Sequence, residues 1–132
     1  GTRVLVEALS RLENPPPAFI SASAIGYYGD RQDEILTEDS AKGAGFFPEV
    51  CDAWEAEAEK AQEFGARVVL MRIGVVLAKD GGALEKMLTP FRFGVGGVVG
   101  SGKQWMSWIA LEDIVRAVHF FIDNQKTSGA YN

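Results

Sequence analysis

Cysteine and histidine are almost absent from this chain of 132 residues, which has one of each, Cys51 and His119. A single cysteine excludes a disulfide within the chain and is typical of a protein from a reducing compartment. With one cysteine and one histidine, the chain also lacks the usual ligands of a structural zinc site. We therefore expect a cytoplasmic protein without a metal centre.

Positive charge and long apolar runs are scarce as well. The chain has 13 lysines and arginines against 18 aspartates and glutamates, which gives a formal net charge of -5. This balance argues against nucleic acid as the main partner, since phosphate binding needs a basic face. No apolar stretch approaches the roughly 18 residues that span a bilayer, and the N-terminus shows no secretory signal pattern, so we expect no membrane partner.

Hydrophobic residues make up 47% of the chain, enough for a folded core at this length. Their periodicity predicts four helices alternating with three strands, an order typical of an α/β fold with right-handed crossovers. The continuous apolar run 68–71 indicates a strand covered on both faces, as in a parallel sheet. The expected helices are 2–12, 48–64, one that follows Gly81 and Gly82, and 111–123, and the expected strands are 18–21, 67–73 and 105–109, with a long loop at 30–46.

Three of the expected helices have faces that the sequence distinguishes. In helix 111–123, His119 lies off the apolar stripe, so we expect it at the surface. In helix 48–64 the acidic side chains are expected to face solvent. The inward residues are expected to be Val4, Leu5, Ala8, Leu9 and Leu12 in helix 2–12 and Val50, Trp54, Ala58 and Ala61 in helix 48–64, with Asp52, Glu55, Glu59 and Glu63 on the solvated face.

The first expected strand ends in small, hydroxyl and phenolic residues. Hydroxyl side chains at Ser21 and Ser23 are followed by Tyr27 and Tyr28 and then by Gly29. In open α/β sheets, ligands bind just beyond the carboxyl ends of the strands. These side chains are therefore candidates for a site, and the alternative is an ordinary turn after a strand.

Several motifs resemble those of the extended short-chain dehydrogenase/reductase superfamily, in the branch related to nucleoside-diphosphate-sugar epimerases. The resemblance implies a Rossmann-like α/β fold and NAD or NADP as cofactor. Within that fold, residues 1–132 correspond to a single partial domain: the C-terminal half of the parallel sheet with flanking helices and a small substrate-side segment. The glycine-rich fingerprint that holds a dinucleotide at a helix N-terminus has no counterpart here. The matching motifs are SASAIGYYGD (21–30), LTE (36–38), FPEVCDAWE (47–55), VLMRIGVVL (69–77), GGAL (81–84), KML (86–88) and GSGKQWMSWI (100–109).

A second departure concerns the catalytic pair of the superfamily, Tyr-x-x-x-Lys. Phe47 stands where the tyrosine would be and Cys51 where the lysine would be. Phenylalanine cannot transfer a proton, and a neutral thiol cannot lower the pKa of a neighbour as an ammonium does. The remaining catalytic candidates are Ser23, to align a substrate oxygen, and Tyr28 or Tyr27 as a relocated acid or base. Cys51 is either a reactive thiol at a helix start or a small buried residue.

The resemblance also implies binding residues. Near the cofactor it places Ser21, Ala22, Arg72, Gly74 and Val75, although Arg72 could equally pair with a carboxylate inside the fold. The substrate side would be lined by the glycine-rich segment before the last helix, for which the alternative is a hairpin with aromatic packing. Its candidate contacts for a small-molecule substrate are Lys103, Gln104, Trp105 and Trp108.

The sequence thus predicts part of an NAD(P)-dependent nucleoside-sugar epimerase or oxidoreductase that transfers a hydride at the nicotinamide. Two alternatives stay open because of Phe47 and Cys51: a protein that binds a dinucleotide or a partner without catalysis, and an inactive fragment. An incomplete parallel sheet would leave a strand edge unpaired, and such an edge favours a homodimer.

Overall fold

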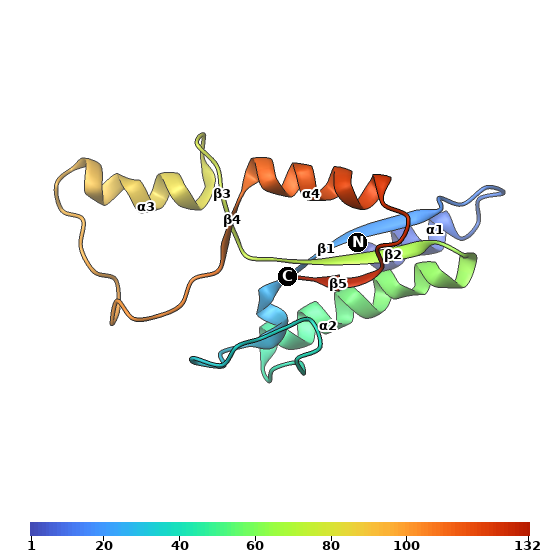
Figure 1. Cartoon of the computed structure of the whole chain (residues 1–132), viewed down its shortest axis with the longest axis horizontal. Coiled ribbons are helices and arrows are strands. Elements are labelled where there is room, and N and C mark those ends of the chain that lie inside the picture. Colours follow the sequence, from blue (N-terminus) through green and yellow to red (C-terminus); the bar gives the residue numbers. More distant parts are fainter.

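The computed structural model describes all 132 residues, and its centre is a three-stranded parallel sheet (Figure 1). The strand order is β1 (Ala18–Ala24), β2 (Arg67–Ile73) and β5 (Gly129–Tyr131). β1 and β2 pair over their whole length, from Ala18 opposite Arg67 to Ala24 opposite Ile73. Because the strands run in the same direction, their carboxyl ends meet at one edge of the sheet.

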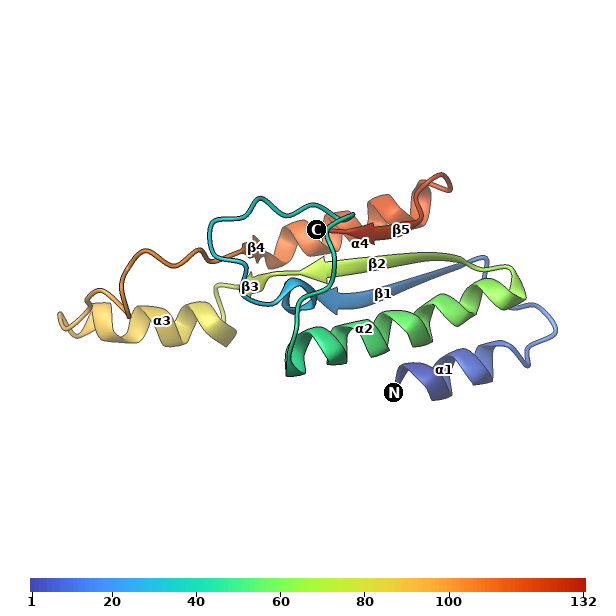
Figure 2. The same ribbon diagram turned by 90° about the horizontal axis from the view of Figure 1, so that it is seen from below.

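Helices cover both faces of this sheet (Figure 2). One face carries α1 (Thr2–Leu9) and α2 (Phe46–Glu59), which continues as a 3-10 turn from Lys60 to Phe64, and the other face carries α4 (Leu111–Asp123). Alternate residues of β2 enter two separate apolar clusters, because successive strand side chains point to opposite faces. Val68 and Leu70 join the cluster under α1 and α2, whereas Val69 and Met71 join the cluster under α4. The expected parallel α/β architecture is confirmed.

A second, smaller unit projects from the carboxyl end of β2. It consists of β3 (Val75–Leu77) paired in parallel with β4 (Trp108–Ala110), of α3 (Gly82–Arg92), and of the segment 93–107 without regular structure. Figure 1 shows α3 and this segment reaching away from the main sheet. The unit begins where Gly74 packs on the backbone of Ser107. A Cβ at Gly74 would lie 2.7 Å from the Ser107 carbonyl oxygen.

The structure corrects several boundaries that we expected from the sequence. Helix 2–12 ends at Leu9, the strand 18–21 extends to Ala24, and the strand 105–109 is Trp108–Ala110. The inward face of α1 also differs, because Val6 is its buried residue while Val4 and Leu5 are 67% and 50% exposed. β3 and β5 were not expected, since each has only three residues.

In α2 and the 3-10 turn that follows it, the structure partly reverses the predicted faces. Ala58 and Ala61 are fully buried, as expected. Trp54, however, is 51% exposed and Glu55 only 6% exposed, so both predictions for these neighbours are wrong. The physical reason for the burial of Glu55 is an arginine on β2, described below. The expectation for His119 is confirmed, since it is exposed on α4.

The sheet has two open edges. β1 and β5 each have a single neighbouring strand, β2, and are the edge strands. None of the helices has both the length and the apolar character needed to cross a bilayer.

Candidate functional site

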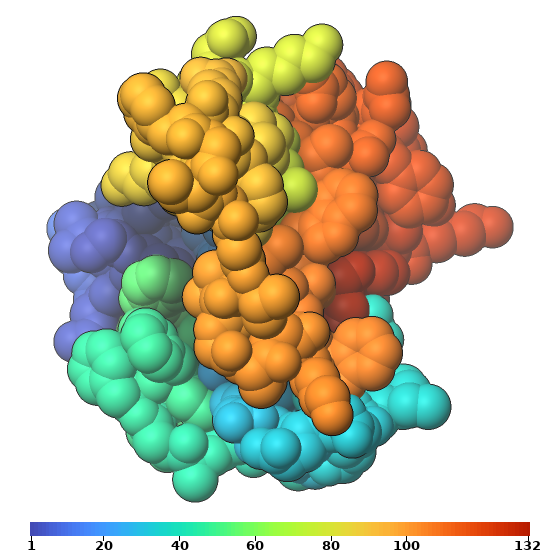
Figure 3. Space-filling model, turned by 90° about the vertical axis from the view of Figure 1, so that its left-hand side faces the viewer, coloured from blue at the N-terminus to red at the C-terminus, as the bar shows by residue number.

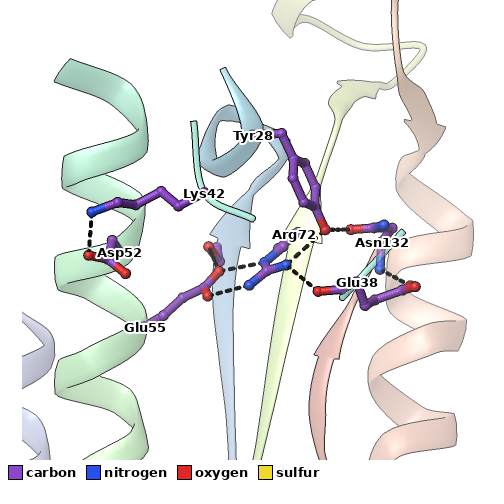
Figure 4. A network of polar contacts seen from close by, with 8 residues as sticks. Tyr28, Glu38, Lys42, Asp52, Glu55, Arg72 and Asn132 are labelled. Atoms are coloured by element: carbon purple, nitrogen blue, oxygen red, sulfur yellow. Dashed lines mark hydrogen bonds and ion pairs between the residues drawn. The ribbon is translucent and has the colours of Figure 1, made fainter. Parts of the chain in front are cut away.

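A buried ion pair lies at the carboxyl end of the sheet (Figure 4). Arg72 of β2 donates from Nε to Oε1 of Glu55 at 2.9 Å and from Nη2 to Oε2 at 2.8 Å. Each residue is 6% exposed. The hydroxyl of Ser23, opposite Arg72 in the β1–β2 register, donates to Oε1 of Glu55 at 2.6 Å. The bidentate pairing and the extra hydrogen bond from Ser23 compensate the desolvation cost of burying both charges.

The remaining donors of Arg72 reach other parts of the chain. Nη1 donates to the hydroxyl of Tyr28 at 2.8 Å and to the backbone carbonyl of Glu38 at 3.1 Å. The Tyr28 hydroxyl in turn donates to Oδ1 of Asn132 at 2.7 Å, and the backbone N–H of Asn132 donates to the Glu38 carboxylate at 2.9 Å. Arg72 thereby joins α2, the loop after β1 and the end of β5.

These contacts also fix the charge of the arginine. The hydrogen bonds to Glu55 raise the pKa of Arg72 above its ordinary value, against an opposing effect of burial, and the bond to Tyr28 adds to the rise. The guanidinium is therefore a permanent cation inside the site. For Arg72, the sequence left open a ligand contact or a carboxylate partner, and the structure provides the carboxylate.

The two tyrosines that follow β1 occupy different environments. Tyr28 is 3% exposed, and its hydroxyl proton is donated to Asn132. Tyr27 is half-buried, its ring lies on the guanidinium of Arg72 at 3.6 Å from carbon Cζ to the ring centroid, and its hydroxyl forms no hydrogen bond within the chain. Of these two phenols, only Tyr27 has a hydroxyl proton that is not donated to another group of the chain.

Phe47 and Cys51 lie on the first turns of α2, next to Gly26. The side chain of Phe47 is 70% exposed, whereas Cys51 is buried. Burial raises the pKa of the Cys51 thiol, so the thiol stays protonated at neutral pH. Of the two interpretations of Cys51, the structure supports a small buried residue.

The residues expected near a cofactor separate into two groups. Ser21 is half-buried and Ala22 exposed on β1, beside the open edge of the sheet. Gly74 and Val75 instead contact the backbone of Ser107, whose carbonyl accepts the Val75 N–H at 2.9 Å. The close approach that Gly74 permits is therefore to the chain's own backbone.

A large open cleft lies beyond the carboxyl end of the sheet. Its volume is about 970 Å³, and its walls are the loop 29–36 and the segment 101–107. In Figure 3 the segment before β4, in orange, reaches the loop after β1, in cyan. Trp105 joins the two walls, because its indole N–H donates to the carboxylate of Asp33 at 2.8 Å. Tyr28 and Asn132 also line the cleft.

Three of the four residues expected on the substrate side lie in this cleft. Lys103, Gln104 and Trp105 line it, and Trp108 does not. The amide of Gln104 is used within its own segment, where Nε2 donates to the carbonyl of Val99 at 2.8 Å. Sequence reasoning missed four residues that contribute to the site: Asp33, Glu38, Glu55 and Asn132. A charged arginine in a strand otherwise buried on both faces was the signal that a carboxylate such as Glu55 had to be buried too.

The sequence matches the family model described as "NAD dependent epimerase/dehydratase family" over residues 1–132. The chain therefore belongs to this family. Among curated relatives, an epimerase family protein of Mycobacterium leprae is 44% identical over 131 residues, which are 99% of this chain and 42% of that protein. An epimerase family protein of Staphylococcus haemolyticus is 42% identical over 133 residues, which are 100% of this chain and 44% of that protein. The chain thus spans less than half the length of these relatives.

Two solved structures share the fold closely. The nucleoside-diphosphate sugar epimerase from Corynebacterium glutamicum superposes with a TM-score of 0.90 at 41% identity, over 99% of this chain and 28% of that one. Human epimerase family protein SDR39U1 (isoform 2), solved with NADPH, also has a TM-score of 0.90, at 33% identity over 99% of this chain and 44% of that one. These matches confirm the Rossmann-like α/β class expected from the sequence, and the human neighbour was solved with a nicotinamide dinucleotide.

Proposed function

We propose that residues 1–132 are the later, substrate-side part of an NAD(P)-dependent domain that transfers a hydride to or from a carbonyl or hydroxyl carbon. The observation that carries the proposal is the likeness to human SDR39U1, which was solved with NADPH. The carboxyl end of the parallel sheet, where ligands of such folds bind, also carries a charged network and an open cleft.

The residues at the open side of β1 fit a nicotinamide dinucleotide in part. The carboxyl half of β1 has only small side chains, and Ser21 and Ala22 leave the strand accessible, so we assign these two to cofactor contact. Arg72, Gly74 and Val75 are occupied by contacts within the chain, and we assign them to support of the site. When bound, the nicotinamide supplies or accepts the hydride.

Tyr27 is our candidate for the proton transfer that accompanies hydride transfer. Its hydroxyl is unpaired within the chain, and the carbonyl oxygen of a substrate would take the proton while the carbonyl carbon takes the hydride. Ser23 donates its own proton to Glu55, so its oxygen is left to accept a hydrogen bond from a substrate hydroxyl, which aligns that substrate oxygen.

The test is NADPH binding and NADPH oxidation with a panel of carbonyl compounds, using the protein that contains this chain. Tyr27→Phe should abolish turnover and leave the Kd for NADPH unchanged. Tyr131→Phe, a tyrosine packed against Phe121 under α4, is the matched control and should retain activity. Turnover unchanged in Tyr27→Phe would remove Tyr27 from the reaction.

A second candidate is a protein that binds the dinucleotide without catalysis. The observation that favours it is the pair Phe47 and Cys51, neither of which can do the work of the superfamily's tyrosine and lysine. NADPH binding without turnover on any carbonyl compound would support this function over the first.

Two further proposals concern the setting of the protein. A single buried, unpaired cysteine fits a reducing compartment, so we place the protein in the cytoplasm. Residues 1–132 by themselves leave the edge of β1 unpaired, and for this part of the protein alone we propose a second copy there as a homodimer contact, in the place that further strands of the whole domain would occupy.

A further inference from the structure

The ring of Tyr27 is supported by two other side chains. The guanidinium of Arg72 lies on the ring, 3.6 Å from Cζ to the ring centroid. The ring of Tyr28 meets that of Tyr27 at 85°, with the two centroids 5.3 Å apart. Contacts of both kinds favour one orientation of an aromatic ring. They do not fix the backbone that carries the ring, which has a support of its own.

The backbone of Tyr27 contacts residues 38–43, the return segment of the loop after β1. The N–H of Gly43 donates to the carbonyl of Tyr27 at 3.0 Å. Gly43 also packs so closely on the next peptide group that a Cβ at this position would overlap the carbonyl of Tyr28. The absence of a side chain at Gly43 therefore lets the return segment lie directly against the turn that carries Tyr27.

Lys42 fastens the return segment to α2. Its ammonium donates to the carboxylate of Asp52 at 2.8 Å, as Figure 4 shows, and to that of Glu49 at 3.2 Å. Asp52 and Glu49 are three positions apart on the helix and therefore share one side of it, so a single ammonium reaches both. The residue next to Gly43 is thus tied to a helix that is itself packed on the sheet.

Arg72 fastens the other end of the return segment. Its Nη1 donates to the backbone carbonyl of Glu38 at 3.1 Å, while the same guanidinium supports the ring of Tyr27. The support of the ring and the support of the backbone are therefore joined through one stretch of chain. A displacement of the return segment would move the Tyr27 phenol with it.

We propose that the return segment positions the Tyr27 phenol for proton transfer, with Lys42 and Gly43 as positioning residues. The proposal rests on the proposed function and adds to it the part of the chain that holds the proton donor. A general acid must lie within hydrogen-bond reach of the atom that it protonates. A small displacement of the phenol should therefore lower kcat and leave the affinity for the cofactor unchanged.

The experiment combines fluorine NMR and steady-state kinetics on the protein that contains this chain. For NMR, 3-fluorotyrosine replaces Tyr27, and for kinetics the unlabelled protein oxidises NADPH with a carbonyl compound. Lys42→Gln should change the fluorine chemical shift and lower kcat about tenfold, with the Kd for NADPH unchanged. Lys42→Arg keeps a cation for both carboxylates and should restore the signal and kcat.

Lys60→Gln is the matched control. It removes an ion pair of the same kind, to Glu57 at 2.8 Å, from the turn that follows α2, and it should change neither the fluorine signal nor kcat. Gly43→Ala tests the backbone contact by a separate route, because the added Cβ displaces the carbonyl of Tyr28, and it should also change the fluorine signal.

Three outcomes would overturn the proposal. The first is an unchanged fluorine signal in Lys42→Gln, and the second is a changed signal with unchanged kcat in an active protein. The third is an equal loss of kcat in Lys60→Gln. The NMR comparison needs no turnover, so a wild type that oxidises no NADPH removes the hydride-transfer function, while the fluorine signal still decides whether the return segment holds the phenol.

Discussion

Arg72 and Glu55 bind each other through two parallel hydrogen bonds, of 2.9 and 2.8 Å, at a place where both side chains are buried. A pair of this kind contributes little when compared with an apolar pair, yet it is costly to break, because the remaining partner becomes a buried charge without compensation. The same pair sets the positions of Ser23 and Tyr28, so it supports both the fold and the walls of the cleft.

Removing one partner of this pair should therefore be far more damaging than removing both. We expect Glu55→Leu to lower the free energy of unfolding by about 3–5 kcal/mol and the double variant Glu55→Leu, Arg72→Met to lower it by less. Urea denaturation measures both. Glu59→Gln, an exposed carboxylate of the same helix, is the control and should change stability by less than about 0.5 kcal/mol. Equal losses in the single and double variants would contradict the pairing argument.

Gly74 should tolerate no side chain, because the backbone of Ser107 packs directly against it. A Cβ there would lie 2.7 Å from the Ser107 carbonyl oxygen, so the junction between β2 and β3 would have to move away from the residue that precedes β4. We expect Gly74→Ala to cost about 1–3 kcal/mol of stability. Gly97→Ala is the matched control, because nothing lies within 4 Å of the position of its Cβ. If Gly74→Ala kept full stability and lost only NADPH affinity, Gly74 would belong to the cofactor site instead.

The contact between α1 and α2 should weaken in acid. Hydrogen bonds from Arg3 and then Lys60 lower the pKa of Glu57 from its ordinary 4.5 to about 2. Since this folded pKa is below the unfolded one, the stabilisation is complete above pH 4.5 and is lost as the pH falls toward 2. Thermal melts of the wild type and Glu57→Gln should therefore differ at pH 7 and converge at the acid end. A difference that stays constant with pH would rule out this origin.

Cys51 should be protected from thiol reagents in the native protein. It is 4% exposed and its pKa is raised by burial, so both access and thiolate are limited. We expect the reaction with a disulfide reagent to be slow in buffer and fast in urea, and Cys51→Ala to retain NADPH binding. A thiol that reacts rapidly without denaturant would revive the interpretation of Cys51 as a reactive residue.

The proposed homodimer should depend on the free edge of β1. Ala22→Lys places a charge on an exposed residue of that strand, and edge lysines oppose pairing with a second strand. In light scattering coupled to gel filtration we expect a dimer for residues 1–132 expressed alone and a monomer for their Ala22→Lys variant. Ala56→Lys, on the exposed side of α2, should remain dimeric. A monomeric wild type would remove the proposal.

The sheet was predictable from the sequence, and the site only in part. The apolar run of β2 indicated a strand covered on both faces, and its alternate residues do enter two clusters. The small residues and tyrosines after β1 indicated a site, and the structure places Ser23 and Tyr28 in one network. Both signals are local in the sequence, so they can be interpreted without knowing which residues pack against them in the fold.

What could not be predicted depends on partners distant in the sequence. Helical periodicity placed Glu55 on a solvated face, because periodicity contains no information about Arg72 on the neighbouring strand, which binds Glu55 in the interior. The same periodicity turned Trp54 inward, although it is 51% exposed. β5 is too short to show a strand-like alternation of apolar residues, and it forms by pairing with β2.

The network at the end of the sheet also bears on the order in which the chain folds. Tyr28 and Asn132 are 104 positions apart, and Glu38 and Asn132 are 94 apart, whereas the helices close within their own turns. Contacts between residues so far apart cost the most chain entropy and form after local ones. The bonds of Tyr28 and Glu38 to Asn132 therefore form only after β5 has been synthesised, so the polar network at the carboxyl end of the sheet is completed later than the helices.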